Sequence, residues 1–286
     1  MQTKQQIQAL LDQIHSYPRR QFGQNFMIDG NLLRLVAAAG NVAPQDLVIE
    51  VGPGTGSLTE ELLSTGAGVI AVEIDRDLAE LLRQRLGQRT GFKLIESDAL
   101  AGKHSLSHSL QTEIAAAVAD GKTVKLVANL PYQIASPLVI EMLVAGVALL
   151  AFTVQKEVGL RLKAPAGSEH YGPLSVMAQL LAKVEILRAI PPQAFWPMPK
   201  IESALVRMTR QDELGLHAGQ FTRFLHGVFS YRRKMLRKGL IESSIAEAVA
   251  DQALARTGFD PRLRPEELSP SQWLALFHAI NAVSAS

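Results

Sequence analysis

A strand-like run that is followed at once by closely spaced glycines restricts the fold of this chain more than any other feature. Residues 46–51 are apolar and β-branched, as in a strand that is buried on both faces. Gly52, Gly54 and Gly56 follow, and a helical pattern through Leu62 comes next. A strand, a glycine turn and a helix form the opening of a nucleotide-binding α/β domain, because glycines let the backbone approach a ligand closely.

The spacing of these glycines distinguishes between cofactors. The pattern is GxGxG, and no GK[ST] follows that would cradle phosphates. This spacing is usual in enzymes that use S-adenosylmethionine, whose methionine-sulfonium arm carries no phosphate. A dehydrogenase that binds NAD is the alternative, and it is disfavoured because dinucleotide enzymes carry GxGxxG.

Two acidic residues stand at the ends of the next two predicted strands. Residues 69–72 end at Glu73, which lies about 20 residues past the glycine loop, where a carboxylate binds ribose hydroxyls. Residues 93–98 end at Asp98, which is placed to accept a hydrogen bond from an adenine amino group. Asp75 directly precedes the next helical pattern and is a predicted N-cap. These acids have no histidines at ligand spacing, so no metal site is expected.

A fourth apolar run, residues 124–127, leads into the turn Asn129-Leu130-Pro131-Tyr132. Pro131 cannot donate to a β-ladder and pushes Leu130 out of the helical region, so the strand ends here. An amide, a turn carbonyl and an aromatic ring then converge at the edge of the sheet where α/β proteins bind ligands. They offer acceptors for an amino group and a surface on which a base stacks. The alternative is an ordinary β-turn whose Tyr packs on the core.

Two other segments leave their interpretation open. Gln24 and Asn25 precede Asp29, a predicted helix N-cap, and they are either ligand-binding amides or loop residues. Phe195 lies in a Pro-rich aromatic stretch that is either a wall of the site or a packed loop. Residues 203–208 are predicted to form a last edge strand, and residues 101–122 an insertion with a helical stretch.

Near Gln211 the pattern becomes helical, which predicts a small all-helical domain over residues 212–286 after an α/β domain over residues 1–211. Residues 221–240 carry basic residues and no acid, beside an apolar helical face with several phenylalanines. A basic helix beside aromatic residues is an electrostatic footprint for nucleic acid, although a solvated basic face of a core helix is the alternative.

Composition excludes several classes of protein. The chain has 286 residues, a net charge of +2 and no Cys, so disulfides and thiolate chemistry are excluded. The first residues predict an amphipathic helix and not a signal peptide, and the longest apolar run is shorter than the roughly 20 residues that span a bilayer. We expect a cytoplasmic protein with no membrane partner.

Taken in order, the motifs resemble those of the small-subunit ribosomal RNA adenine N6,N6-dimethyltransferases, over nearly the whole chain. The motifs that carry the resemblance are residues 22–26 (FGQNF), 50–56 (EVGPGTG), 72–75 (VEID), 97–99 (SDA), 129–132 (NLPY), 155–158 (QKEV), 197–200 (PMPK), 231–236 (YRRKML) and 264–269 (RPEELS). The 155–158 motif and the long C-terminal region favour this family over the dimethylases that act on large-subunit RNA. A DNA adenine methylase would more often carry Asn/Asp-Pro-Pro-Tyr. A non-catalytic RNA-binding or assembly factor is a further alternative.

The resemblance implies a Rossmann-like class I methyltransferase domain with a mostly parallel sheet and helices on both faces, followed by a small helical RNA-binding domain. It implies dimethylation of two adjacent adenosines near the 3′ end of the small-subunit RNA, with a role in ribosome biogenesis. The partner would be that RNA or the pre-small ribosomal subunit, and we expect a monomer. Met27 stands where the family usually has Leu.

Residue roles carried over from the family are expectations of the same kind. S-adenosylmethionine would be bound by Gln24, Asn25, Met27, Gly52, Gly54, Glu73, Asp98 and Asn129. The catalytic turn would be Asn129, Leu130, Pro131 and Tyr132, with the target base stacked on Tyr132 and on Phe195. RNA would be bound by Arg232, Arg233, Lys234, Arg237 and Phe195.

Overall fold

The computed structural model describes residues 2–102 and 105–285, and the chain forms two compact units. The first unit comprises Met1–Gly159 and Val184–Arg210, and the second comprises Leu160–Lys183 and Gln211–Ser286. The sequence division at residue 211 places the segment 160–183 in the first domain. In the structure this segment groups with the C-terminal helices, because helix α8 (Pro173–Leu181) packs against α9 (Ala218–Phe229) and α12 (Pro270–Ser284).

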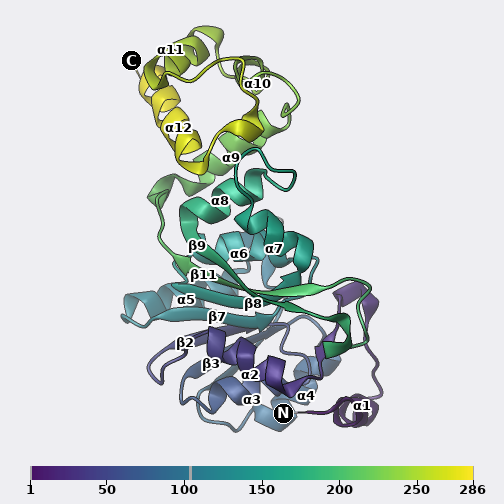
Figure 1. Ribbon diagram of the computed structural model, residues 1–286. Helices are drawn as coiled ribbons and strands as arrows, with labels where there is room; N and C mark the ends of the chain where they lie inside the picture. Colours follow the sequence, from purple (N-terminus) through teal and green to yellow (C-terminus); the bar gives the residue numbers. More distant parts are fainter. Residues whose placement is uncertain (1, 103–104, 286) are drawn as a thin grey trace. The chain divides into compact units, whose positions relative to one another are not determined.

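The first unit is built around a seven-stranded sheet in the order β4-β3-β2-β7-β8-β11-β9 (Figure 1). The strands are β2 (Leu47–Val51), β3 (Gly68–Glu73), β4 (Phe92–Glu96), β7 (Val124–Asn129), β8 (Leu149–Gln155), β9 (Ala182–Ile190) and β11 (Ser203–Arg210). Strands β4, β3, β2, β7 and β8 run parallel, and β11 pairs antiparallel with β8. Parallel neighbours bring their carboxyl ends to one edge of the sheet, which is where the site forms.

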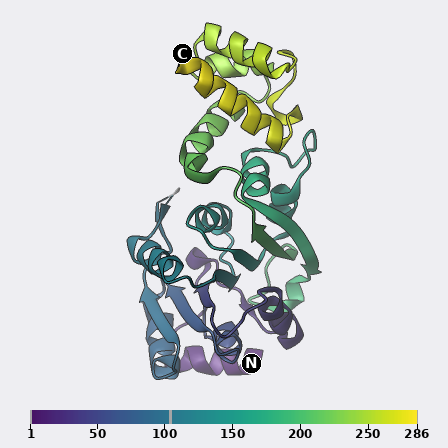
Figure 2. The same ribbon diagram turned by 90° about the vertical axis from the view of Figure 1, so that its left-hand side faces the viewer.

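Helices of this unit cover both faces of the sheet (Figure 2). They are α2 (Gly30–Ala39), α3 (Ser57–Leu63), α4 (Arg76–Leu86), α5 (His108–Ala119) and α6 (Ala135–Val144). Helix α1 (Lys4–Gln13) packs against α4 and the segment before α2, while α7 (Lys156–Lys163) crosses from one unit to the other along the chain. The two predicted caps are confirmed: Asp29 accepts from the N–H of Asn31 and Leu32 at the start of α2, and Asp75 accepts from the N–H of Asp77 at the start of α4.

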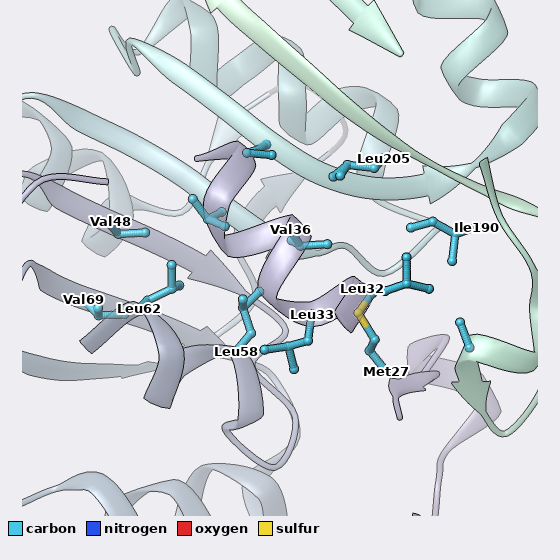
Figure 3. Close-up of a cluster of buried hydrophobic side chains, with 14 of the residues drawn as sticks. Met27, Leu32, Leu33, Val36, Val48, Leu58, Leu62, Val69, Ile190 and Leu205 are labelled. Atoms are coloured by element: carbon cyan, nitrogen blue, oxygen red, sulfur yellow. The ribbon is translucent and has the colours of Figure 1, made fainter. Parts of the chain in front are cut away.

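One apolar cluster joins α2 and α3 to a face of the sheet (Figure 3). Leu33 and Val36 of α2 and Leu62 of α3 pack against Val48 and Val69 of the central strands. These residues recur at helical spacing on the helices and at alternate positions on the strands, so the periodicity of the sequence determines which side chains face the core. The cluster holds the helices that follow the ligand-binding loops in a fixed position.

Two expectations about the sheet need correction. Strand β11 is not an edge strand, because β8 and β9 flank it. The edge is β9, whose exposed charged positions, Lys183 and Arg188 among them, match a strand with one solvated side. The expected insertion is largely the crossover helix α5, which a parallel connection from β4 to β7 requires. Beyond that helix it adds a short hairpin, β5 (Leu100–Gly102) and β6 (Ser105–Leu106), whose connecting residues 103 and 104 lie outside the described part of the chain.

The second unit is helical, and its core is aromatic. Trp273 of α12 is fully buried and packs against Phe224 and Phe229 of α9, while Phe221 and Phe277 meet edge to face at 5.3 Å. In the described residues of the chain, no helix is long and apolar enough to cross a membrane.

The basic segment 221–240 is not one continuous helix, as the sequence suggested. Helix α9 ends before Ser230, and a turn leads to α10 (Leu236–Glu242), which α11 (Glu247–Thr257) follows. The second helix begins where the N–H of Leu236 donates to the carbonyl of Leu263 at 2.6 Å, and the N–H of Arg237 to that of Pro261. Distant carbonyls thus satisfy donors that a continuous helix would have used internally.

Candidate active site

A cavity of about 320 Å³ lies at the carboxyl edge of the sheet in the first unit. Its walls come from the segment before α2, the glycine loop after β2, the ends of β3 and β4, and the turn after β7. All of the residues predicted to bind the cofactor or to form the catalytic turn line it: Gln24, Asn25, Met27, Gly52, Gly54, Glu73, Asp98, Asn129, Leu130, Pro131 and Tyr132. The topology therefore brings together residues that are spread over more than a hundred positions of the sequence.

The glycine loop passes close to two other walls of the cavity. Gly52 and Gly54 have φ angles of 72° and 59°, a left-handed conformation that residues with a side chain rarely adopt. A Cβ on Gly54 would lie 2.9 Å from the Phe26 ring, and one on Gly52 would lie 3.1 Å from the Pro131 ring. The two glycines thus keep the backbone of the loop next to both the segment before α2 and the Asn-Leu-Pro-Tyr turn.

Glu73 is held as a buried acceptor at the end of β3. Its side chain is 4% exposed, its Oε1 accepts from the N–H of Asp75 at 2.9 Å, and its Oε2 accepts from the N–H of Gly54 at 3.4 Å. Burial raises the pKa of Glu73 to about 7, although these N–H donors oppose the shift. A ligand with hydroxyl donors would favour the charged carboxylate here.

Gln24 lines the cavity, but its amide is occupied by protein contacts. Its Nε2 donates to Asp75 Oδ2 at 2.9 Å, and its Oε1 accepts from the N–H of Arg19 at 2.8 Å. Arg19 Nη1 in turn donates to Asp75 Oδ1 at 2.9 Å, and Arg19 also pairs with Asp77. Gln24 therefore fastens the loop before α2 to the start of α4, which is a structural contribution to the cavity.

The Asn-Leu-Pro-Tyr turn is fixed by hydrogen bonds at both ends. Asn129 Nδ2 donates to the carbonyl of Asn25 at 2.7 Å, and Asn129 Oδ1 accepts from the Thr153 hydroxyl at 2.5 Å. The Tyr132 hydroxyl lies 2.6 Å from the Ser203 hydroxyl. Burial raises the pKa of Tyr132, so the phenol stays neutral at physiological pH. The amide and the ring are both held at the wall of the cavity.

Comparison with known proteins identifies the family. The sequence profile described as ribosomal RNA adenine dimethylase matches residues 16–282. The ribosomal RNA small subunit methyltransferase A of Anaeromyxobacter dehalogenans (strain 2CP-C) is 40% identical, over 95% of this chain and 96% of its own. That of Methylococcus capsulatus is 37% identical, over 92% and 98%. The chain belongs to the ribosomal RNA adenine dimethylase family.

Solved structures agree on the fold of this dimethylase. A dimethyladenosine transferase from Plasmodium falciparum matches with a TM-score of 0.68 at 20% identity, over 91% of this chain and 98% of its own. The 23S ribosomal RNA methyltransferase ErmE matches with a TM-score of 0.61 at 24% identity, over 90% and 100%. The predicted class I methyltransferase fold is confirmed, and S-adenosylmethionine is the cofactor of the family.

The cavity of this dimethylase fits such a cofactor. The Ser57 hydroxyl, at the start of α3, lines the cavity and is buried without a hydrogen-bond partner among the described residues. Together with the Glu73 carboxylate and the backbone at Gly52 and Gly54, it offers polar partners to a ligand whose other surface meets apolar walls such as Ile74 and Leu78. Asp98 is exposed after the end of β4, where it lines the same cavity.

Several residues of the dimethylase site were not found from the sequence. Gln2 is buried, its Nε2 donates to the carbonyl of Thr55 at 3.1 Å, and its Oε1 accepts from the Thr55 hydroxyl at 2.5 Å. Ile7 of α1 lines the cavity, so the first helix forms part of its wall. Thr153 and Ser203 contact the Asn-Leu-Pro-Tyr turn from β8 and β11. The signal for Thr153 was a hydroxyl inside an otherwise apolar strand.

Phe195 does not line the cavity of this dimethylase, and the expectation that it stacks on a base needs correction. Its side chain is 2% exposed and belongs to the apolar cluster around α2. The reason is the strand pair β1 (Phe26–Met27) and β10 (Phe195–Trp196), in which Met27 pairs with Phe195. Trp196, the partner of Phe26, stacks on the Phe26 ring at 6.3 Å between centroids.

The basic residues of the second unit divide into two groups. Arg237 pairs with Glu247 and Asp251 at 2.5–2.9 Å, and Lys234 pairs with Glu242 at 2.8 Å. These contacts neutralise the two cations. The Arg237 pairs connect helices α10 and α11, whereas the Lys234 pair joins the turn before α10 to the end of that helix. Arg232 and Arg233 are exposed in the turn before α10, and they form no ion pair within the described part of the chain.

Proposed function

We propose that this protein dimethylates N6 of two adjacent adenosines near the 3′ end of the small-subunit ribosomal RNA. Membership in the ribosomal RNA adenine dimethylase family gives the reaction class. The observation that carries the assignment of the site is the Asn129 turn, whose amide and ring are fixed at the wall of the cavity. The names of relatives that cover nearly all of this chain support the small-subunit RNA as substrate.

The cofactor site in this proposal comprises the predicted residues that line the cavity. When it is bound, S-adenosylmethionine supplies an electrophilic methyl group on a sulfonium. Glu73 would accept hydrogen bonds from ribose hydroxyls, and Asp98 would accept one from the adenine amino group. Gly52, Gly54 and Met27 would contribute backbone and apolar contact, Asn25 would help to close the site, and Gln24 would hold the loop in place.

Besides the cofactor, the cavity must bind the amine of the target adenine. The exocyclic nitrogen of adenine is a weak nucleophile, because its lone pair is delocalised into the ring. Asn129 Oδ1 and the Leu130 carbonyl would accept from its two N–H groups and so favour a pyramidal nitrogen that is aimed at the methyl group. The contribution of the protein is therefore mainly position and orientation. Pro131 fixes the turn that carries both acceptors.

Tyr132 would hold the base itself. An adenosine must leave its stack to enter the cavity, which costs a few kcal/mol and less in a loop than in a helix. Stacking of the base on an aromatic ring contributes about 1–3 kcal/mol, which offsets part of this free energy. The Ser203 hydroxyl keeps the ring of Tyr132 in one orientation.

The partner in this proposal is the small-subunit RNA within the pre-small ribosomal subunit, and the working form is a cytoplasmic monomer. Arg232 and Arg233 are the cations best placed to contact phosphates, because they are exposed and unpaired in the described structure. Lys234 and Arg237, which the sequence grouped with them, already pair with acids, so we assign them a smaller share of RNA binding.

The test of the function is methyl transfer from labelled S-adenosylmethionine to unmethylated small ribosomal subunits, followed by nucleoside analysis. N6,N6-dimethyladenosine in the small-subunit RNA is the expected product, and modification of large-subunit RNA alone would overturn the substrate assignment. Asn129→Ala should lower turnover at least a hundredfold with RNA affinity nearly unchanged, because in this proposal the amide meets the RNA only at the reacting nitrogen. Asn281→Ala, an exposed amide of α12, is the matched control.

RNA binding is tested separately by its dependence on salt. Replacing Arg232 and Arg233 with Gln should reduce the slope of log affinity against log salt by about 0.7–0.9 for each phosphate that the variant no longer neutralises. Arg256→Gln, an exposed cation of α11, is the control. An unchanged slope in the double variant would assign these arginines to another role.

A further inference from the structure

Thr153 is a polar residue in the interior of an apolar strand. It is fully buried in β8, whose sequence is otherwise apolar apart from the terminal Gln155. Its neighbours across the sheet are Asn129 on β7 and Leu205 on β11. A buried hydroxyl is costly unless it is hydrogen-bonded, and this hydroxyl donates to Asn129 Oδ1 at 2.5 Å.

Two hydrogen bonds hold the Asn129 amide in one orientation. The carbonyl of Asn25 is an acceptor only, so the amide nitrogen must face it, and their separation is 2.7 Å. The amide oxygen then faces the Thr153 hydroxyl. A flipped amide would set its oxygen against the carbonyl of Asn25, which cannot donate, so this carbonyl selects the orientation. The Thr153 hydroxyl adds a second hydrogen bond, which holds the amide oxygen in place.

The hydrogen bond from Thr153 leaves one acceptor position open on the Asn129 amide oxygen. A carbonyl oxygen of an amide has two lone pairs, and Thr153 uses one of them. The second is available at the wall of the cavity, where Asn129 lies. Two donors on one oxygen compete for its electrons, so Thr153 would not make this oxygen a stronger acceptor. Its effect is to hold the oxygen in place.

We propose that Thr153 is a positioning residue for methyl transfer, which holds the Asn129 amide oxygen at the place where it meets the target amine. The inference rests on the role proposed above for Asn129. Without the Thr153 hydroxyl, the carbonyl of Asn25 would be the remaining hydrogen-bond partner of the amide in the described structure, and the amide would populate rotated positions in which its oxygen no longer meets the target nitrogen. The amine would then lose one of the two acceptors that orient it.

The test compares Thr153→Val with Thr153→Ser in the full-length protein. Valine keeps the shape of the side chain without the hydroxyl, whereas serine keeps the hydroxyl. We expect Thr153→Val to lower kcat by about tenfold, the value of one ordinary hydrogen bond, with KM for the small subunit and calorimetric affinity for S-adenosylmethionine within about twofold. Thr153→Ser should restore most of kcat. A Ser variant as slow as the Val variant would overturn the proposal.

A control separates positioning from loss of stability. Ser175→Ala removes another fully buried hydroxyl, which accepts from the N–H of Gly172 at 3.2 Å and donates to the carbonyl of Arg161 at 2.6 Å within the second unit. It should cost comparable stability in urea unfolding while leaving kcat unchanged. An equal loss of kcat in Ser175→Ala and Thr153→Val would show that stability, and not orientation, explains the effect.

A double-mutant cycle identifies the partner through which Thr153 acts. In the Asn129→Ala background, Thr153→Val should cause no further loss of kcat, because the amide that it orients is absent. A further tenfold loss would overturn the proposal. If Asn129→Ala itself kept near-normal turnover, the role of Asn129 would fail, whereas loss in Asn129→Ala without loss in Thr153→Val would refute the role of Thr153 alone.

The orientation also has a readout that does not involve activity. In ¹⁵N-labelled protein, the side-chain amide signal of Asn129 is identified by its absence in Asn129→Ala. We expect this signal to move and its hydrogens to exchange faster with solvent in Thr153→Val, and to resemble the wild type in Thr153→Ser. An unchanged signal in Thr153→Val would show that the carbonyl of Asn25 alone fixes the amide.

Discussion

Glu50 gives a prediction in which stability itself depends on a buried proton. The side chain is 2% exposed at the end of β2, and its Oε2 accepts from the Thr59 hydroxyl at 2.6 Å. Burial, with a smaller contribution from the negative charge of Glu73, raises the pKa of Glu50 to about 8. The folded protein therefore keeps this carboxyl protonated at pH values where the unfolded chain releases the proton.

The size of the effect follows from this difference. The pKa rises from 4.5 in the unfolded chain to about 8 in the folded protein. The resulting stabilisation is fully present below pH 4.5 and is lost as the pH rises to about 8, at about 1.36 kcal/mol per pH unit. Between about pH 5.5 and 7.5 the free energy of unfolding should thus fall by about 2.5 kcal/mol through Glu50 alone.

Glu50→Gln removes the titration and keeps the shape of the protonated acid. The variant should lose the part of the pH dependence that belongs to Glu50 and become more stable than the wild type by a margin that widens from about pH 5.5 to about 8. Urea unfolding at several pH values measures this, with Glu169→Gln, an exposed acid, as the control. Parallel pH curves for Glu50→Gln and the wild type would refute the reasoning.

Two further predictions concern other buried charges. Because Glu73 has its pKa raised to about 7 and must be ionised to accept from ribose hydroxyls, affinity for S-adenosylmethionine should weaken by up to tenfold per unit below about pH 7 and level off above it. Calorimetry checks this, and a flat profile would exclude Glu73 as the acceptor. Lys125→Met should destabilise the first unit by about 3–5 kcal/mol, because it leaves Asp46, the buried partner of Lys125 at 2.7 Å, without its cation. Recovery of stability in Lys125→Met combined with Asp46→Asn would confirm the cause in urea unfolding.

The sequence predicted those parts of the fold that depend on neighbouring residues. The strand before Gly52 and the strand that ends at Glu73 were predicted, because apolar β-branched runs and the glycines that follow or precede them determine the backbone conformation of their own segment. The caps Asp29 and Asp75 were found for the same reason, since an N-cap bonds to N–H groups two or three residues ahead. Because neighbouring strands of a parallel sheet end at the same edge, the residues predicted at the strand ends could also be predicted to lie close together.

The features that the sequence did not predict depend on distant partners. The start of α10 is fixed by carbonyls of residues 261 and 263, and no Pro or Gly marks the break after Ser230. The order of β9 and β11 in the sheet depends on which strands pair, and the sequence of one segment does not show its partner. The charges along β9 were nevertheless a signal that it lies at the edge. The sequence indicated Thr153 only as part of a strand, because Asn129, its partner, lies 24 residues earlier.

The docking of the first helix has a practical consequence for handling the protein. Gln2 binds both the hydroxyl and the carbonyl of Thr55, and Thr55 and Ile7 both line the cavity, so the wall of the cavity and the anchoring of α1 share one set of contacts. A purification tag fused directly ahead of Gln2 would compete with that anchoring and weaken cofactor affinity. Conversely, added S-adenosylmethionine should shield the first residues from exopeptidases, which makes trimming at this end a simple assay for ligand binding.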